Sequence, residues 1–335
     1  MVFLTLPILV LTLIVLGYAS SRAVRSLMKL SSFFRFPKFL LSFVIVGLGT
    51  SLPDILLAFN IAAHTSQVAN KETAVAFSEL LISSVIGANV IVLCLVLGIL
   101  VIKRGVFKVR ENIIIENFGW IFFVLMIPLF LLIDGSLSFA DGIILVVVYA
   151  MYLYVVKEEE SIFKREELEA HESALFEPRE KKRDRILEAI KLLFFLIVVL
   201  AASAVVVELA VGISAEFNVS PALIGFTVVA IGLALPEFAL DLTALRAREE
   251  EIVWGDLIGS FITELTLVLG IAALFGSISF SFGKFFVGYA FMILAFILVF
   301  LFAYQKKELT RAQGIALVLL YFVFLSTQVE LLLAG

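Results

Sequence analysis

The chain has 335 residues, of which 62% are apolar and only 16% are charged. Soluble domains contain about 25% charged residues, so this composition excludes a soluble globular enzyme as well as a disordered, collagen-like or coiled-coil chain. The net charge of −4 gives no reason to expect nucleic-acid binding, and the single cysteine excludes an intrachain disulfide or a cysteine metal cluster. A polytopic membrane protein remains.

Continuous apolar runs give the predicted elements. Each run has roughly the 20 residues that a spanning helix needs, whereas the strands of a membrane β-barrel alternate apolar and polar residues. The first run lacks a basic leader and is interpreted as a span rather than a cleaved signal peptide. We predict an all-α membrane protein with ten transmembrane helices, at about residues 2–20, 39–63, 74–101, 112–133, 137–156, 186–211, 222–245, 252–276, 284–304 and 312–333.

Basic residues predict the orientation of these helices, because cytoplasmic loops are enriched in Lys and Arg. Of the 25 basic residues, all but Lys71, Lys191 and Lys284 lie in alternate loops on one predicted side. We therefore expect an integral protein of the cell membrane with both termini outside and a cytosolic linker at 157–185. The linker separates a first five-helix repeat, residues 1–156, from a second, residues 186–335.

A repeated motif relates the two units. Gly-Leu-Gly-Thr-Ser-Leu-Pro-Asp at 47–54 matches Ala-Ile-Gly-Leu-Ala-Leu-Pro-Glu at 230–237, with an offset of 183 residues. In the helices that follow, residues 86–88 and 95–98 match 258–260 and 267–270 at an offset of 172. Because five helices, an odd number, separate the copies, they cross the membrane in opposite directions. The predicted fold is therefore two inverted-topology five-helix repeats, which in secondary transporters enclose the substrate site.

Each copy places a proline inside a predicted span. Proline lacks an N–H and clashes with the carbonyl four residues earlier, which belongs to Gly49 for Pro53 and to Gly232 for Pro236. Irregular backbone in a membrane is tolerated only where it is buried in protein or lines a cavity. The sequence therefore predicts two broken helices that make the carbonyls of Gly49 and Gly232 available to a polar site.

Acidic residues lie near the middle of three predicted spans, at Asp54, Glu237 and Glu264. A central carboxylate costs about 3 kcal/mol to insert, and neither Arg nor Lys occurs at these helix centres. Cations or protons are therefore the expected partners, because carboxylates and freed carbonyls are hard ligands that suit Ca²⁺. Thr50 and Ser51, one turn before Asp54, add hydroxyl oxygens.

Other acids lie outside these positions. Asp241 follows Glu237 by one turn on the same helix face and is included in the candidate site as a supporting or proton-carrying group. Asp256 and Glu79 are interpreted as capping or interfacial residues. No cofactor is expected, because the chain has only two histidines, both outside the predicted spans.

These motifs resemble the α-repeats of the calcium/cation antiporter superfamily, and of the sodium/calcium exchangers in particular. The family pattern is Gly-Thr-Ser-Leu-Pro-Glu, followed in the next helix by Gly-Ser-Asn-x-x-(Asn/Asp), and residues 49–54 match it with Asp54 for Glu. The resemblance implies that Asp54 and Glu237 are paired calcium ligands, that Glu264 replaces an Asp, and that Ser260 supplies a motif hydroxyl. It also implies that the first and sixth spans move during transport.

The chain departs from this pattern mainly in its second repeat. Leu233 and Ala234 replace Thr and Ser, Phe261 replaces Asn, and in the first repeat Ala88 and Val92 replace a Ser and an Asn or Asp. Several oxygens that the family uses for sodium are therefore missing, while the central divalent site is better preserved.

The predicted function is secondary active antiport of Ca²⁺, or of a related cation, against Na⁺. Coupling to H⁺ is the alternative, because carboxylates with few neutral oxygens can equally bind and release protons. A cation channel is the alternative of another class, although a channel does not need two inverted broken helices. An enzyme is not expected, since no span offers a nucleophile–base pair. The expected partners are inorganic cations and the lipid bilayer.

Overall fold

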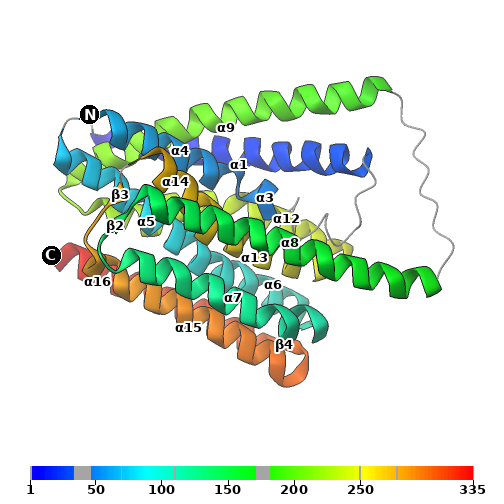
Figure 1. The fold of residues 1–335 in the computed structure, drawn as a ribbon. Helices are drawn as coiled ribbons and strands as arrows, with labels where there is room; N and C mark the ends of the chain where they lie inside the picture. The colour runs from blue at the N-terminus through cyan, green and yellow to red at the C-terminus, as the bar shows by residue number, and fades with distance from the viewer. Residues whose placement is uncertain are drawn as a thin grey trace.

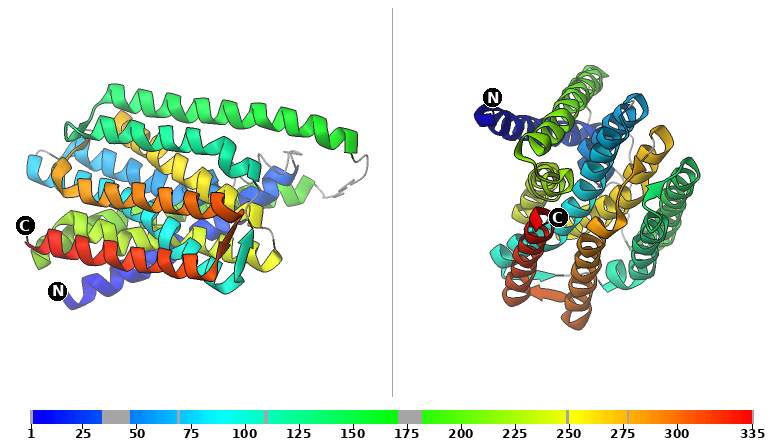
Figure 2. Two further views of the ribbon diagram at one scale, coloured as in Figure 1. Left: turned by 90° about the horizontal axis from the view of Figure 1, so that it is seen from below. Right: turned by 90° about the vertical axis from the view of Figure 1, so that its left-hand side faces the viewer.

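A computed structural model describes residues 2–33, 47–68, 70–108, 111–170, 182–248, 250–276 and 278–334. The helices form an elongated bundle in which most of them run along its length (Figure 1). Both ends of the chain lie at the same end of the bundle, as two views show (Figures 1 and 2). The C-terminal end of α8 (Phe139–Ala170) and the N-terminal end of α9 (Lys182–Phe217) lie toward the opposite end of the bundle.

The remaining elements follow in two series, in which η denotes a π-helical segment. The first comprises α1 (Val2–Phe33), α3 (Gly47–Thr50), α4 (Leu52–Gln67), α5 (Lys71–Val90), η2 (Ile91–Val96), α6 (Leu97–Arg104), β1 (Val106–Lys108), α7 (Glu111–Leu132) and β2 (Ser136–Leu137). The second comprises α10 (Pro221–Ile224), η3 (Gly225–Val229), α11 (Ala230–Leu233), α12 (Leu235–Ala247), α13 (Glu250–Thr263), η4 (Glu264–Val268), α14 (Leu269–Phe275), β3 (Ile278–Ser279), α15 (Phe282–Lys306), β4 (Glu308–Thr310) and α16 (Arg311–Ala334).

Seven helices among the described residues are long and apolar enough to cross a membrane. Two shorter apolar helices, Gly119–Leu132 and Phe139–Val155, lie where the fourth and fifth spans are predicted. The second predicted span, 39–63, falls partly outside the described residues. An all-helical membrane protein is thus confirmed, whereas the count of ten spans stays a prediction.

The first part of the predicted linker, 157–185, is helical and continues α8. Residues 157–170 belong to α8, which runs without interruption from Phe139, and α9 begins at Lys182. The part of the linker between them, 171–181, lies outside the described residues.

Two short strand pairs occupy equivalent sequence positions. Strand β1 pairs with β4, and β2 pairs with β3, both antiparallel. An offset of 172 residues, the one that relates the repeated motifs, carries the start of β1 onto the start of β3 and the start of β2 onto the start of β4. Strands β3 and β4 nevertheless lie toward opposite ends of the bundle (Figure 1).

Glycine pairs bring long helices into backbone contact at two further equivalent places. A Cβ added to Gly314 of α16 would lie 2.9 Å from the Gly98 carbonyl oxygen of α6, and one added to Gly142 of α8 would lie 3.0 Å from the Gly270 carbonyl oxygen of α14. Small residues of this kind are what allow helices to approach closely in membranes. The two contacts are again related by the 172-residue offset.

Candidate cation site

The two predicted helix breaks are confirmed. Helix α3 ends at Thr50 and α4 begins at Leu52, while α11 ends at Leu233 and α12 begins at Leu235. In each case the proline lies in the first turn of the second helix, where its missing N–H is not needed. Asp54 and Glu237 follow the prolines in those first turns, where the positive end of the helix dipole favours a carboxylate.

The helices packed beside these breaks are irregular at matching positions. Segment η2 interrupts the helix that starts with α5, and η4 interrupts the helix that starts with α13. The two segments end at Val96 and Val268, again 172 residues apart. π-Helical segments are rare and often occur at functional sites, and Glu264 is the first residue of η4.

Five carboxylates gather where these elements meet. The side chains of all five are buried, with at most 2% of the residue exposed: Asp54, Glu237, Asp241, Asp256 and Glu264. Asp256 and Asp54 lie near Glu237, and Asp54, Glu237 and Asp256 lie near Glu264. None of the ion pairs in the described part of the chain includes any of them. The cluster therefore holds acidic groups without basic partners.

The interpretation of Asp256 as a capping or interfacial residue is wrong. Asp256 is buried among the acids, and its carboxylate accepts a hydrogen bond from the Thr50 hydroxyl at 2.7 Å. Thr50 is therefore in the site, although its hydroxyl is directed to Asp256. Glu79, by contrast, lies apart from the cluster and accepts from Lys284 Nζ at 2.7 Å.

Asn89 is a second residue that the sequence interpretation missed. Its Nδ2 donates to Glu264 Oε2 at 2.7 Å, and both side chains are buried. The motif Gly87-Ala88-Asn89 carried the signal, because Asn is the third residue of the family pattern Gly-Ser-Asn. No local pattern marks Asp256.

Several carboxylate oxygens in the cluster lack a hydrogen-bond partner. They are both oxygens of Glu237, Oδ1 of Asp54 and Oδ1 of Asp241, all of them buried. A buried polar atom without a partner is costly, and such atoms mark where a ligand would be stabilised. Among the described residues, however, no three acidic, histidine or cysteine side chains meet closely enough to form a metal-ligand set.

The other candidate residues lie around these acids. Ser51 donates its hydroxyl to the Gly47 carbonyl at 2.9 Å, and Ser260 lies beside Glu237 while donating to the Leu257 carbonyl at 3.5 Å. Gly49 and Gly232 both pack against α1, where an added Cβ would lie 3.3 Å from Leu27 and 2.4 Å from Leu13, respectively.

The positions at which the second repeat departs from the family pattern are buried and apolar. Leu233, Ala234 and Phe261 all belong to the hydrophobic core, as does Val92 of the first repeat. Their side chains supply no oxygen to the cluster. The site therefore has many carboxylates and few neutral side-chain oxygens.

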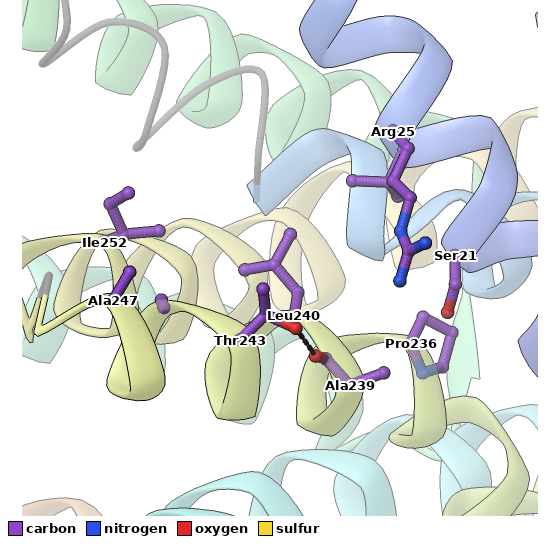
Figure 3. Close-up of a pocket in the computed structure, with 10 residues that line it drawn as sticks. Ser21, Arg25, Pro236, Ala239, Leu240, Thr243, Ala247 and Ile252 are labelled. Carbon is purple, nitrogen blue, oxygen red and sulfur yellow. Dashed lines mark hydrogen bonds between the residues drawn. The ribbon is translucent and has the colours of Figure 1, made fainter.

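A cavity of about 170 Å³ lies beside the second break, between α12 and α1. Its lining includes Ser21 and Arg25 of α1 and Pro236 and Thr243 of α12 (Figure 3). The Thr243 hydroxyl is turned back onto its own helix, where it donates to the Ala239 carbonyl at 2.8 Å. None of the five acids lines this cavity, so it is separate from the acidic cluster.

Together, these features define an integral membrane protein with a buried, acidic site between broken helices. The sequence profile of the sodium/calcium exchanger protein family matches residues 4–157 and 188–330, and the chain belongs to this family.

Individual relatives agree with this assignment. The chain is 28% identical over 275 residues to the inner membrane protein YrbG of Escherichia coli (strain K12), which covers 81% of this chain and 80% of that protein. It is 34% identical over 102 residues to the sodium/calcium exchanger MaX1 of Methanosarcina acetivorans, and this alignment covers 30% of this chain and 29% of that protein. The solved structure of the sodium-calcium exchanger NCX_Mj matches with a TM-score of 0.65 at 25% identity, covering 97% of this chain and 99% of the other. The chain is thus a cation antiporter rather than an enzyme.

Proposed function

We propose that the protein exchanges Ca²⁺ for Na⁺ across the membrane and that Asp54, Glu237 and Glu264 bind the transported cation. One observation carries the proposal: both carboxylate oxygens of Glu237 are buried without a protein partner, beside other acids. Where no basic side chain neutralises such a carboxylate, a bound cation or a proton does. Carboxylate oxygens are also the ligands that Ca²⁺ prefers.

Neutral oxygens around the acids complete the proposed site. Ser51 and Ser260 contribute hydroxyl groups, and Gly49 and Gly232 contribute carbonyls that the following prolines cannot bond. Ca²⁺ takes six to eight oxygen ligands, so carboxylates alone do not complete its shell. No cofactor takes part, and the bound ions are the transported ones.

Coupling to H⁺ is the second candidate, and it is favoured by the apolar residues at Leu233 and Ala234. Side-chain hydroxyls at these positions would serve as neutral ligands for Na⁺, whereas carboxylates can exchange a proton for a cation without them. The two coupling ions differ in the gradient that drives Ca²⁺ movement.

For the architecture, we infer two inverted five-helix repeats, residues 1–156 and 186–335. The reciprocal strand pairs and the two glycine contacts, all related by one sequence offset, support this arrangement. Strand β1 lies with its partner β4, whereas β3, its equivalent in the second repeat, lies toward the opposite end of the bundle. This placement supports the inversion. We also infer that both termini lie outside the cell and that the linker 157–185 is cytosolic, because the basic loops all fall on the linker's side.

Uptake of ⁴⁵Ca²⁺ into proteoliposomes containing the purified protein tests the proposal. An outward Na⁺ gradient should drive Ca²⁺ inward above its equilibrium level, because antiport converts one gradient into the other. Uptake driven by a pH gradient alone would replace Na⁺ with H⁺ as the coupling ion. If neither gradient drives uptake, Ca²⁺ is not the substrate.

A further inference from the structure

We propose that Asp241, Asp256 and Thr50 form a second cation site, separate from the central one and specific for a divalent cation. The inference rests on the proposed function, in that it assumes a chain that transports cations through its acidic cluster. It assigns a role to two acids that the central site does not use.

Three elements bring these side chains together. Asp241 lies on α12, Asp256 on α13 and Thr50 on α3, and α13 packs against both of the others. The contact of α3 with α13 is a backbone contact, since a Cβ added to Gly47 would lie 2.8 Å from Gly259 Cα. This close approach holds the Thr50 hydroxyl 2.7 Å from Asp256 Oδ1.

The two carboxyl groups face each other. They lie within hydrogen-bond reach of one another, and each residue is only 1% exposed. Asp241 Oδ1 remains buried without any partner. Two facing carboxylates in a buried setting repel each other unless a cation or a shared proton lies between them, and no ion pair of the described residues supplies a cation.

The chemistry of the pair fits a divalent cation. Two carboxylates carry two negative charges, which one divalent ion neutralises. The carboxylates and the Thr50 hydroxyl are hard oxygen ligands of the type that Ca²⁺ binds, with water completing the shell.

The position of the pair separates it from the central site. Asp241 lies four residues beyond Glu237, about 6 Å along the helix, and Asp256 lies eight residues before Glu264, about 12 Å. Both displacements lead toward the connection between α12 and α13. The cluster therefore extends from its centre toward one end of the bundle, and a cation held by the pair would occupy a step between the central site and that end. Repulsion between ions at adjacent sites favours their release.

Equilibrium binding of ⁴⁵Ca²⁺ to the full-length purified protein tests the proposal. We expect two bound ions per chain, and one after Asp241→Asn or Asp256→Asn, with the central site retained. Glu237→Gln should also leave one ion, held by the pair. The control Glu216→Gln removes an exposed carboxylate from α9 and should leave two.

The two proposals fail in different ways. A wild-type stoichiometry of one that is lost in Glu237→Gln and unaffected by Asp241→Asn would overturn the second site while supporting the central one. A stoichiometry that falls to zero in Asp241→Asn and is unchanged in Glu237→Gln would leave the pair as the only site and overturn the central assignment.

Luminescence of Tb³⁺, which replaces Ca²⁺ at oxygen sites, gives a readout that does not depend on counting ions. Trp254 lies two residues before Asp256 on α13, so it should sensitise Tb³⁺ bound at the pair. Emission should be lost in Trp254→Phe and in Asp256→Asn but retained in Glu237→Gln. Emission that persists in folded Asp256→Asn would contradict the proposal.

Discussion

The two halves of the molecule contribute different chemistry to one acidic cluster. The second half supplies four of the five buried acids, whereas the first supplies Asp54 and two neutral donors, Thr50 and Asn89. Both donors reach across the interface, Thr50 to Asp256 and Asn89 to Glu264. The two halves therefore share a backbone arrangement, seen in their strand pairs and glycine contacts. They differ in side-chain chemistry, because the second half supplies most of the carboxylates and the first supplies the hydrogen-bond donors.

This division shows how a duplicated site can become specialised. At the first break Thr50 and Ser51 carry hydroxyls, while at the second Leu233 and Ala234 carry none. The first half holds the carboxylates in place through neutral donors, and the second half provides the negative charge that a cation requires. Substitutions in either half should consequently have different effects.

The largest effect is expected from removing charge in the second half. Glu237→Gln keeps the shape of the side chain but removes a carboxylate that has no other partner. Uptake of ⁴⁵Ca²⁺ into proteoliposomes should fall at least about tenfold, equivalent to about 1.4 kcal/mol. Glu216→Gln is the matched control. Unchanged transport by Glu237→Gln would show that the central site is assigned to the wrong residues.

The next effect concerns a neutral donor of the first half. Asn89→Asp removes the hydrogen bond to Glu264 and places a second carboxylate beside it. We expect uptake to decrease by about tenfold, because the two changes together disfavour the ionised Glu264 by about 1–2 kcal/mol. Asn60→Asp makes the same substitution where the amide donates to Ser203, and should retain most of the uptake. Equal losses in the two variants would contradict the role given to Asn89.

Substitution of the equivalent glycines at the two breaks should change the stability of the protein, to different extents, and leave the charge of the site unchanged. An added Cβ at Gly232 would lie 2.4 Å from Leu13, whereas one at Gly49 would lie 3.3 Å from Leu27. Gly232→Ala should therefore lower the free energy of unfolding by about 1–3 kcal/mol, and Gly49→Ala by less. Thermal unfolding in detergent measures both. A larger loss in Gly49→Ala would mean that α1 does not pack more tightly against the second break than against the first.

The smallest effect is expected from restoring hydroxyls to the second break. Leu233→Thr combined with Ala234→Ser makes this break resemble the first, and each hydroxyl can bond to its own helix without another partner. The Na⁺ dependence of Ca²⁺ uptake should increase severalfold, because the added oxygens suit a monovalent cation. Ala239→Ser, beside the separate cavity, is the control. An unchanged Na⁺ dependence would indicate that these positions do not bind Na⁺.

Much of this arrangement was predictable because it depends on local chemistry. A proline in a span breaks a helix wherever it occurs, so Pro53 and Pro236 located both breaks, and the acids next to them located the cluster. Asp256 is misassigned because its partner Thr50 is 206 residues away in the sequence. The motif around Asn89 marks that residue, but it does not identify its partner Glu264, which is 175 residues away. Such contacts depend on how two distant halves pack, and neither periodicity nor motif spacing reports this.

The most direct test of the central claim is tracer exchange without any ion gradient, since it does not depend on the coupling ion. Proteoliposomes are loaded with unlabelled Ca²⁺, and the entry of ⁴⁵Ca²⁺ is measured. An antiporter that binds Ca²⁺ at Glu237 should show faster tracer entry with internal Ca²⁺ than without it, and Glu237→Gln should abolish that acceleration. Tracer entry that is independent of internal Ca²⁺, or equally accelerated in Glu237→Gln, would contradict the account.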